Sequence, residues 1–338
     1  MKRISTFLLL TAFVLVSGSA WAQKNYCVAF YNVENLFDTY HDEGKNDYEY
    51  LPEGRIGWNH EKYTAKLQNL ETVLSQLGRD VVPEGPVAIG LAEVENFKVL
   101  QDLITQPKLR SENYQYVHYE GPDKRGIDCA LIYNPKLFLP IATKLVPSVP
   151  FKGDTVHLTR GFLIVRGEVR EANEELTIIV NHWPSRGADA PVRMHAAQQV
   201  KQITDSLYRD NAHAKIVIMG DLNDDPMDAS VVEGLGAKKY ISEVGKYGFF
   251  NPWWSTLEDD GIGTLKYRGK WNLFDQIIVS KSLLAKRGLR FVSNKVFNPD
   301  YLFQTDGKYA GYPLRTYGGK VWMNGYSDHF PTMIFLKK

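Results

Sequence analysis

The segment from Lys215 to Pro226 (KIVIMGDLNDDP) combines an apolar run with a cluster of polar side chains. Ile216 to Met219 has the length and composition of a buried strand, and Gly220 ends it. Asp221 and Asn223 follow two residues apart, so both side chains leave the backbone on the same side. The carboxylate can polarise a water molecule or hold a hard cation, and the carboxamide can donate to a charged oxygen. An acidic turn is the alternative, because Asp, Asn and Pro all favour turns.

Polar side chains also stand at the ends of other apolar runs. Glu93 directly ends the run that begins at Pro86, although Glu95 is an alternative, and His182 ends the run that Pro184 halts. A lone histidine in such a place is more often structural than catalytic. Several such ends together supply the donors that a metal or anion site needs. In chain order the set is Asn32, Glu93, His182, Asp221, Asn223, Asp275, Asp328 and His329.

Strands and helices that position these residues are interspersed along the chain. Apolar runs predict strands at 26–32, 86–93, 114–119, 127–133, 159–169, 176–180, 216–219, 274–280 and 332–336. Helical periodicity predicts helices from an Asn59 cap to Gly78, at 97–104 and at 191–208. Residues 38–59 show no periodicity, which is typical of a surface loop.

This order of elements favours a layered α/β sandwich over a fully parallel, doubly wound sheet. Several strands are joined by hairpin-length connections, among them 159–169 and 176–180. There is no internal repeat and no long linker, so residues 23–338 are expected to form a single domain of the α/β (α+β) class.

The first 22 residues have the features of a secretory signal peptide. Lys2 and Arg3 precede an apolar run from Phe7 to Val16, and Ala20-Trp21-Ala22 supplies the cleavage pattern. The mature chain is expected to begin at Gln23 and to be exported to the periplasm or beyond the cell. No later run is long enough to cross a bilayer, so no transmembrane segment is expected.

Composition sets limits on the substrate. The 338 residues carry 40 basic and 39 acidic side chains. Cleavage of the signal peptide removes two basic residues, which leaves the mature chain with a net charge of 38 − 39 = −1. Bulk charge therefore gives no support to strong nucleic-acid binding, and any such affinity must come from a local patch. Cys27 and Cys129 both fall in strand-like runs, and buried free thiols are favoured over a disulfide.

The ordered set of polar residues resembles the endonuclease/exonuclease/phosphatase superfamily. The likeness extends from YNVEN at 31–35 to SDHFP at 327–331, and GDLN and SDH carry weight because they follow the upstream glutamate in this order. The resemblance implies a four-layer sandwich, in which two mixed β-sheets pack face to face with helices outside. It also implies an active site at one edge of the sandwich.

The same resemblance implies roles for individual residues. Glu93 is similar to the principal metal ligand, with Asn32 and Asp328 near it. Asp221 resembles the group that activates water, Asn223 a donor to the scissile phosphate, and His182 a phosphate contact. His329 resembles the phosphate-facing histidine, and the pattern places Asp275 behind it as a carboxylate partner that raises its pKa.

The donor types indicate the cation. Carboxylates, carboxamides and histidines without cysteine ligands suit Mg²⁺ or Mn²⁺, with Ca²⁺ as an alternative, better than structural zinc. Phosphodiesters repel a nucleophile by their negative charge, so a hard cation and hydrogen-bond donors are the chemistry required.

Secreted bacterial nucleases are the members that the chain resembles most, and nucleic acid is the expected substrate. Rings that alternate with cations in GTLKYRGKW suit stacked bases and phosphates. An ordinary hairpin is the alternative for that segment. The residues expected to contact substrate are Arg125, Ser185, Arg186, Lys266, Arg268 and Trp271.

Two other functions stay open at this stage. One is a lipid phosphodiesterase of sphingomyelinase type, or a phosphatase, with Phe249-Phe250 and Trp253-Trp254 as a membrane-inserting hairpin, although core packing of these rings is favoured. The other is a catalytically inactive binding module. The sequence does not decide between DNA and RNA, between endo- and exo-cleavage, or among the cations, and it leaves the oligomeric state open.

Overall fold

The computed structural model describes residues 24–153 and 159–338, and the segment expected to be a signal peptide lies outside this part. Five α-helices are present in it: α1 (His60–Leu74), α2 (Phe97–Ile104), α3 (Pro107–Arg110), α4 (Ala190–Asp210) and α5 (Trp253–Glu258). The strands of the two large sheets are β1 (Asn25–Leu36), β2 (Pro86–Val94), β3 (Gln115–His118), β4 (Asp128–Tyr133), β5 (Phe138–Val146), β6 (Phe162–Val169), β7 (Glu174–His182), β8 (Ile216–Asp221), β9 (Ala237–Lys238), β10 (Phe249–Phe250), β13 (Asp275–Ser280), β14 (Arg290–Val296) and β17 (Thr332–Lys337). Two small hairpins complete the set, β11 (Leu265–Tyr267) with β12 (Lys270–Asn272) and β15 (Tyr317–Gly318) with β16 (Val321–Trp322).

Both large sheets are mixed. The first sheet has the strand order β14-β17-β1-β2-β4-β3, and the second has the order β5-β6-β7-β8-β13-β10-β9. In each sheet a parallel pair, β1 with β2 and β7 with β8, is flanked by antiparallel neighbours. Hairpin connections and crossovers therefore coexist, as the predicted class requires.

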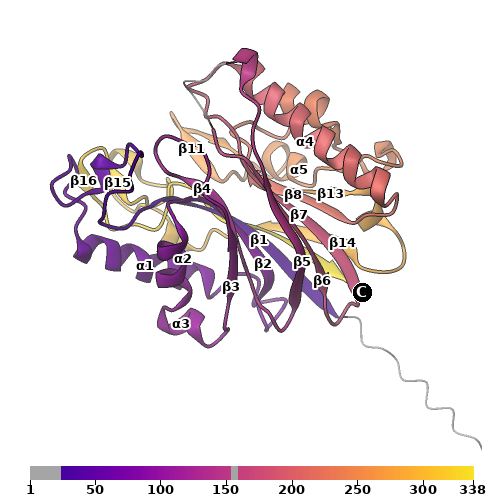
Figure 1. The fold of residues 1–338 in the computed structure, drawn as a ribbon, viewed down its shortest axis with the longest axis horizontal. Coiled ribbons are helices and arrows are strands. Elements are labelled where there is room, and N and C mark those ends of the chain that lie inside the picture. The colour runs from indigo at the N-terminus through magenta and orange to yellow at the C-terminus, as the bar shows by residue number, and fades with distance from the viewer. Residues whose placement is uncertain (1–23, 154–158) are drawn as a thin grey trace, which may run out of the picture.

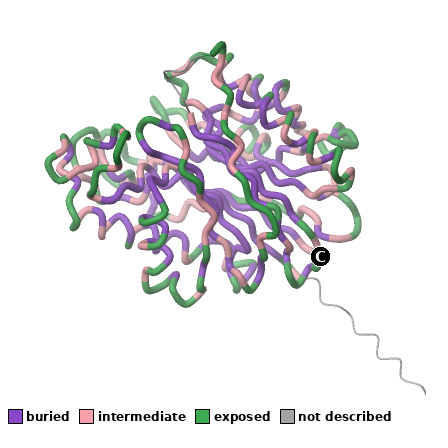
Figure 2. Tube along the Cα trace, in the orientation of Figure 1, coloured by how far each residue is buried: buried purple, intermediate pink, exposed green. Residues whose placement is uncertain are grey.

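The layers follow from which faces are apolar. β1 and β2 of the first sheet contact β7, β8 and β13 of the second, and this interface is the main hydrophobic core. A second cluster of apolar side chains lies under α4, on the outer face of the second sheet. In Figure 1, α1, α2 and α3 lie on the side of the first sheet and α4 and α5 on the side of the second. Figure 2 shows the buried strands in the middle and exposed loops around them. The four-layer sandwich implied by the resemblance is confirmed.

Most predicted elements are present, and three edge strands were missed: β5, β14 and the two-residue β9. Helix 97–104 matches α2, and the predicted hairpin is the antiparallel pair of β6 and β7. β5 and β14 had no predicted counterpart. Both are edge strands with many exposed residues. β5 carries Pro140 within its apolar stretch, which argues against a strand in the sequence, and β14 has neither an apolar run nor clean alternation.

The first ring of each aromatic pair near residue 250 belongs to the core. Phe249 and Trp253 are 0% exposed, and the Trp253 indole donates to the carbonyl oxygen of Ile277 at 2.9 Å. Core packing, the favoured interpretation, is confirmed, and the membrane-inserting hairpin is wrong for these two rings. Cys27 and Cys129 are both buried and free, as expected.

Among the helices of residues 24–153 and 159–338, none combines the length and the apolar character that a bilayer crossing requires.

Candidate active site

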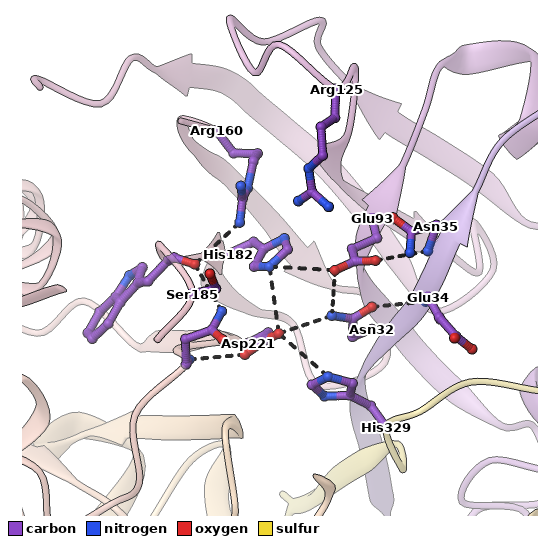
Figure 3. Close-up of polar contacts among 12 residues, drawn as sticks. Asn32, Glu34, Asn35, Glu93, Arg125, Arg160, His182, Ser185, Asp221 and His329 are labelled. Atoms are coloured by element: carbon purple, nitrogen blue, oxygen red, sulfur yellow. Dashed lines mark hydrogen bonds and ion pairs between the residues drawn. The ribbon is translucent and has the colours of Figure 1, made fainter. Parts of the chain in front are cut away.

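The strand ends of both sheets deliver the predicted residues to one edge of the sandwich. In the second sheet His182 of β7, Asp221 of β8 and Asp275 of β13 are paired in register across three neighbouring strands. Residues in register on adjacent strands share one face of a sheet. In the first sheet Asn32 of β1 lies in register beside Ala92 of β2, and Glu93 follows. The Asn32 carboxamide joins the sheets, because it donates to Asp221 Oδ2 at 3.0 Å (Figure 3).

The backbone departs from regular strand geometry at this edge. Register shifts occur on both sides of Glu93, and this residue has a φ of 66°. Glu34 and Asn35, at the end of β1, have φ values of 51° and 52°. A β-bulge redirects a side chain, and positive φ at a glutamate is a strained conformation that the surrounding contacts must stabilise. The Asn35 amide, which donates to Glu93 Oε2 at 2.9 Å, is one of these contacts.

Asp221 is the centre of the polar network. It is 2% exposed and accepts hydrogen bonds from Asn32 and from the backbone amide of Asn223. Burial raises its pKa to about 7; the nearby charge of His329 opposes this rise and that of Asp275 adds to it. A carboxylate with a pKa near neutrality is suited to accept a proton from water.

His329 and Asp275 form a buried dyad. The two lie 54 residues apart, and His329 Nδ1 is 2.7 Å from Asp275 Oδ2. Burial by itself lowers the pKa of His329, but the carboxylates of Asp275 and Asp221 outweigh burial and hold this pKa well above the usual value. The imidazole is therefore a cation at neutral pH, as predicted from the sequence.

The pKa of His182 is displaced in the opposite direction. Its Nε2 is 3.8 Å from Glu93 Oε1 and 3.6 Å from Asp221 Oδ2, which is too long for hydrogen bonds. Burial, with Arg160, Arg125 and His329 nearby, lowers its pKa well below the ordinary value. Two histidines of one site thus have pKa values displaced in opposite directions, which separates an acid from a neutral ring.

Asn223 is held by the turn after β8. It adopts a φ of 52°, and its carboxamide nitrogen donates to the Trp183 carbonyl oxygen at 3.0 Å. A primary amide carries two N–H groups, so one remains for a ligand in the cavity that Asn223 lines.

Three charged residues beside the site, Glu34, Lys66 and Arg315, were not among the predicted site residues, whereas their neighbour Asp328 was. Glu34 is 6% exposed, and burial together with the charge of Asp328 raises its pKa to about 7, against the opposing charges of Lys66 and Arg315. Arg315 bridges the acids, with Nη2 2.5 Å from Asp328 Oδ2 and Nε 3.4 Å from Glu34 Oε1. Lys66 is buried, and its ammonium donates to Thr316 Oγ1 at 2.7 Å and to the carbonyl oxygen of Tyr326. Of these residues, only Glu34 could have been identified from the sequence, because it stands two residues after Asn32 on the same strand.

A cavity of about 770 Å³ lies at this edge of the sandwich. Glu93, His182, Asp221, Asn223 and His329 are among the residues that line it. Lys124, Arg125 and Arg160 also line it, and Figure 3 shows the two guanidinium groups above His182 and Glu93. Arg160, which was not predicted, is 7% exposed and is held by Asp123 at 2.9 Å and by the Trp183 carbonyl oxygen at 3.3 Å. The cavity therefore presents positive charge opposite the carboxylates, as an anionic ester would require.

The residues predicted to contact substrate fall into two groups. Arg125 and Ser185 line the cavity. Arg186 does not line it, and its guanidinium is bound by Asp225 at 3.0 Å and by Asp228 at 2.8 Å. Lys266, Arg268 and Trp271 also lie outside the cavity lining. Their contact with substrate stays a prediction.

The acidic residues fit a hard divalent cation. Burial raises the pKa of the Asp221 and Glu34 carboxyls, so a nearby cation would stabilise their charged forms, and carboxylate oxygens are the donors that such ions prefer. One group of ligand-type atoms, from Asp221, Asp275 and His329, lies within 4.8 Å. Asp275 and His329 of this group already share the dyad hydrogen bond. On the Glu93 side of the site, the Asn32 nitrogen donates to Glu93 Oε1 at 3.4 Å, and Asn32 Oδ1 accepts from the Glu34 amide.

Comparison with known proteins agrees with this geometry. A family model described as "Endonuclease/Exonuclease/phosphatase family" matches residues 27–338. No curated protein sequence matches the chain significantly.

Solved structures share the fold at low sequence identity. A mannosyl-6-phosphatase from Bacteroides thetaiotaomicron is 17% identical, with 92% of this chain and 99% of that chain covered and a TM-score of 0.58. The catalytic domain of human Nocturnin is 16% identical, with 92% and 94% covered and a TM-score of 0.57. TDP2 from D. rerio, solved with a single-strand DNA product, is 13% identical, with 93% and 99% covered and a TM-score of 0.56.

Proposed function

The chain belongs to the endonuclease/exonuclease/phosphatase family, hydrolases that act on phosphate ester bonds, and from this we propose that it is an exported, divalent-metal-dependent nuclease. The observation that carries the proposal is the convergence of Asp221, His182 and protonated His329 on a cavity that Arg125 and Arg160 flank. This arrangement suits hydrolysis of a phosphodiester, which needs a base, donors and positive charge in one place.

Mg²⁺ or Mn²⁺ would be held by Glu93, with Asn32 and Asp328 beside it. Such an ion supplies Lewis-acid polarisation of a phosphoryl oxygen.

The residues of the chain perform the proton and orientation steps. Asp221, with a pKa near 7, takes a proton from the attacking water. His329 stays protonated through Asp275 and donates to a nonbridging phosphate oxygen, where negative charge builds up. Neutral His182 and the free N–H of Asn223 orient the same phosphate.

Nucleic acid as the substrate is supported by the β11–β12 hairpin. Thr264, which precedes β11, accepts from the Phe330 amide, so the hairpin begins next to His329. Tyr267 is 63% exposed and Arg268 is exposed at its tip, where a base and a phosphate can bind. By contrast, Lys266 lies 5.0 Å from the ring centroid of Trp271, and Trp271 packs on Phe330.

A small phosphate ester is the second candidate substrate. The cavity volume of about 770 Å³ is in the range that encloses a compact organic ligand. One fold neighbour is a mannosyl-6-phosphatase, which shows that the fold can serve such a ligand.

A substrate panel separates the two candidates. Purified chain with Mg²⁺ or Mn²⁺ is offered single- and double-stranded DNA, RNA, sugar phosphates, sphingomyelin and bis(4-nitrophenyl) phosphate. We expect cleavage of nucleic acid, with a steep loss of rate as salt increases through counterion release. Intact polynucleotides together with hydrolysed sugar phosphate or sphingomyelin would overturn the nuclease proposal.

A matched pair of variants tests the hairpin. Tyr267→Ala/Arg268→Ala should lower kcat/KM on an oligonucleotide by about tenfold, since stacking contributes about 1–3 kcal/mol per base. Its turnover of bis(4-nitrophenyl) phosphate should be unchanged. The control is Tyr240→Ala/Arg166→Ala, which removes an exposed ring and an exposed cation from other elements. Equal losses on both substrates would show that the hairpin affects folding and not nucleic-acid binding.

Export is tested separately. Cell fractionation followed by mass spectrometry should find the chain outside the cytoplasm with Gln23 at its N-terminus. A cytoplasmic chain that retains residues 1–22 would refute export without affecting the enzymatic proposal.

A further inference from the structure

A second group of metal-ligand side chains lies at the base of the loop that joins β3 to β4. His118 is the last residue of β3, Asp128 is the first of β4, and the two strands are antiparallel neighbours. Both side chains are 4% exposed, while that of Glu120 is 53% exposed. These three residues lie outside the lining of the active-site cavity.

One polar atom of each buried side chain lacks a hydrogen-bond partner. Within the described residues, His118 Nε2 and Asp128 Oδ2 are both inaccessible and unpartnered. They are 3.5 Å apart, longer than the ~2.7–2.9 Å of a charge-assisted hydrogen bond. Burying two such groups without a partner costs free energy, so an additional group between them is expected.

The geometry fits a metal ion. His118, Glu120 and Asp128 each offer one ligand atom, and these atoms all lie within 4.8 Å of one another. Tetrahedral bonds of about 2.0–2.1 Å place two ligand atoms ~3.4 Å apart, close to the distance between His118 and Asp128. Glu120 is free to adjust, because it is exposed. A Cβ on Gly121 would lie 2.3 Å from Asp128 Oδ1, so the turn is shaped closely around this carboxylate.

The surrounding charges do not already neutralise the group. Lys45 is the nearby cation, but its ammonium donates to the carbonyl oxygens of Gly121 at 2.9 Å and Asp123 at 3.3 Å. Among the described residues, the ion-pair contacts of Glu120 and Asp128 are with His118 and not with a lysine or arginine.

We propose that His118, Glu120 and Asp128 form a structural site for a zinc-like dication, separate from the catalytic metal. An imidazole with two carboxylates suits Zn²⁺ and related transition ions, whereas Mg²⁺ favours oxygen ligands and water. Water completes the coordination on the exposed side of Glu120.

The role of the site follows from what its loop carries. Residues 119–127 include Arg125, which lines the cavity, and Asp123, which holds Arg160 at 2.9 Å. An ion that joins the two ends of this loop restricts the conformations of the segment between them. The ion therefore orders the positive rim of the active-site cavity without contacting substrate.

Metal binding is measured independently of hydrolysis. The Glu93→Gln chain, with Mg²⁺ in large excess to occupy hard oxygen sites, is titrated with Zn²⁺ by calorimetry and with Co²⁺ by visible absorption. One equivalent should bind, and Co²⁺ should give the intense d–d bands of a tetrahedral site. His118→Gln should abolish this binding, and Glu120→Gln should weaken it by about 10- to 100-fold. The matched control His213→Gln, at an exposed histidine, should bind like the parent.

Limited trypsin digestion supplies the second readout. Lys124 and Arg125 are exposed within the loop and are trypsin sites. Zn²⁺ should slow cleavage there in the parent chain. At a Zn²⁺ concentration that saturates only the parent, it should give little protection in Glu120→Gln, whose exposed position makes it a safe variant for folding. Binding that is absent in the parent, or that is unchanged in both His118→Gln and Glu120→Gln, would overturn the proposal. Neither result depends on whether the chain is a nuclease.

Discussion

Asp275→Asn removes one negative charge from the dyad and preserves the shape of the side chain. In the wild type, His329 Nδ1 and Asp275 Oδ2 lie 2.7 Å apart in a buried environment. A hydrogen bond to a charged group contributes ~1.5–3 kcal/mol, and each ~1.4 kcal/mol is tenfold in rate, so we expect kcat to fall about 10- to 150-fold. KM should change little, because the protonated ring is needed most when charge builds up on the phosphate.

The pH profile carries the specific signature. In the proposed mechanism, protonation of Asp221 should define the acidic limb of the wild-type profile, and deprotonation of His329 should define the alkaline limb. The Asp275 charge raises both pKa values, so both limbs of Asp275→Asn should move to lower pH. The assay is kcat against pH on bis(4-nitrophenyl) phosphate at saturating metal.

The pH dependence of stability provides an independent check on the direction in which folding shifts the pKa of His329. A histidine whose pKa is raised by folding stabilises the protein below its unfolded pKa of about 6.5, and this stabilisation is lost as pH rises through the folded pKa. Urea denaturation should therefore show the largest cost of Asp275→Asn at low pH.

Asp224→Asn is the matched control. Asp224 is another buried carboxylate near this edge, paired with Arg193 at 2.8 Å, and it does not line the catalytic cavity. The Asp224→Asn variant should be less stable than the wild type, but neither limb of its pH profile should move. Near-wild-type turnover in Asp275→Asn, unmoved limbs, or losses that simply multiply with those of His329→Ala would refute the dyad.

Three further variants test other parts of the site. Glu93→Gln should require at least about tenfold more Mg²⁺ or Mn²⁺ for half-maximal rate, since a ligand is lost; turnover that persists in excess chelator would contradict the metal assignment. Lys66→Met should destabilise the fold by about 3–5 kcal/mol in urea, because it leaves buried Glu34 poorly compensated, whereas Lys201→Met, at a half-exposed helical pair, should cost under about 1 kcal/mol. Gly220→Ala should lower both stability and kcat, because its Cβ would lie 2.2 Å from the Asn181 carbonyl oxygen beside Asp221; Gly236→Ala, with open space around it, should leave kcat unchanged.

The sequence by itself determined the residues at the ends of the buried strands. Asp221, Glu93 and His182 each follow an apolar run, and that pattern is local, so it is readable without a structure. The order of these residues, together with GDLN and SDH, also indicated the family. The four layers followed from that resemblance.

Local patterns carry little information about edge strands and about partners distant in sequence. β5 and β14 form at the margins of their sheets, where pairing with one neighbour replaces burial as the stabilising contact. Arg186 and Lys266 illustrate the same limit at the level of side chains. Both look like free cations in sequence, yet one is bound by acids and the other packs against Trp271 and Tyr312.

Tertiary structure alone decided which charges face each other. Arg160 reaches the cavity because Asp123, 37 residues earlier, holds it, and Arg315 lies between Glu34 and Asp328 because β1 and β17 are neighbours. The opposite protonation states of His182 and His329 have the same origin. Both are buried histidines at the same edge. Burial dominates the lowered pKa of His182, with the charges of Arg160, Arg125 and His329 adding to it, whereas Asp275 and Asp221 outweigh burial at His329.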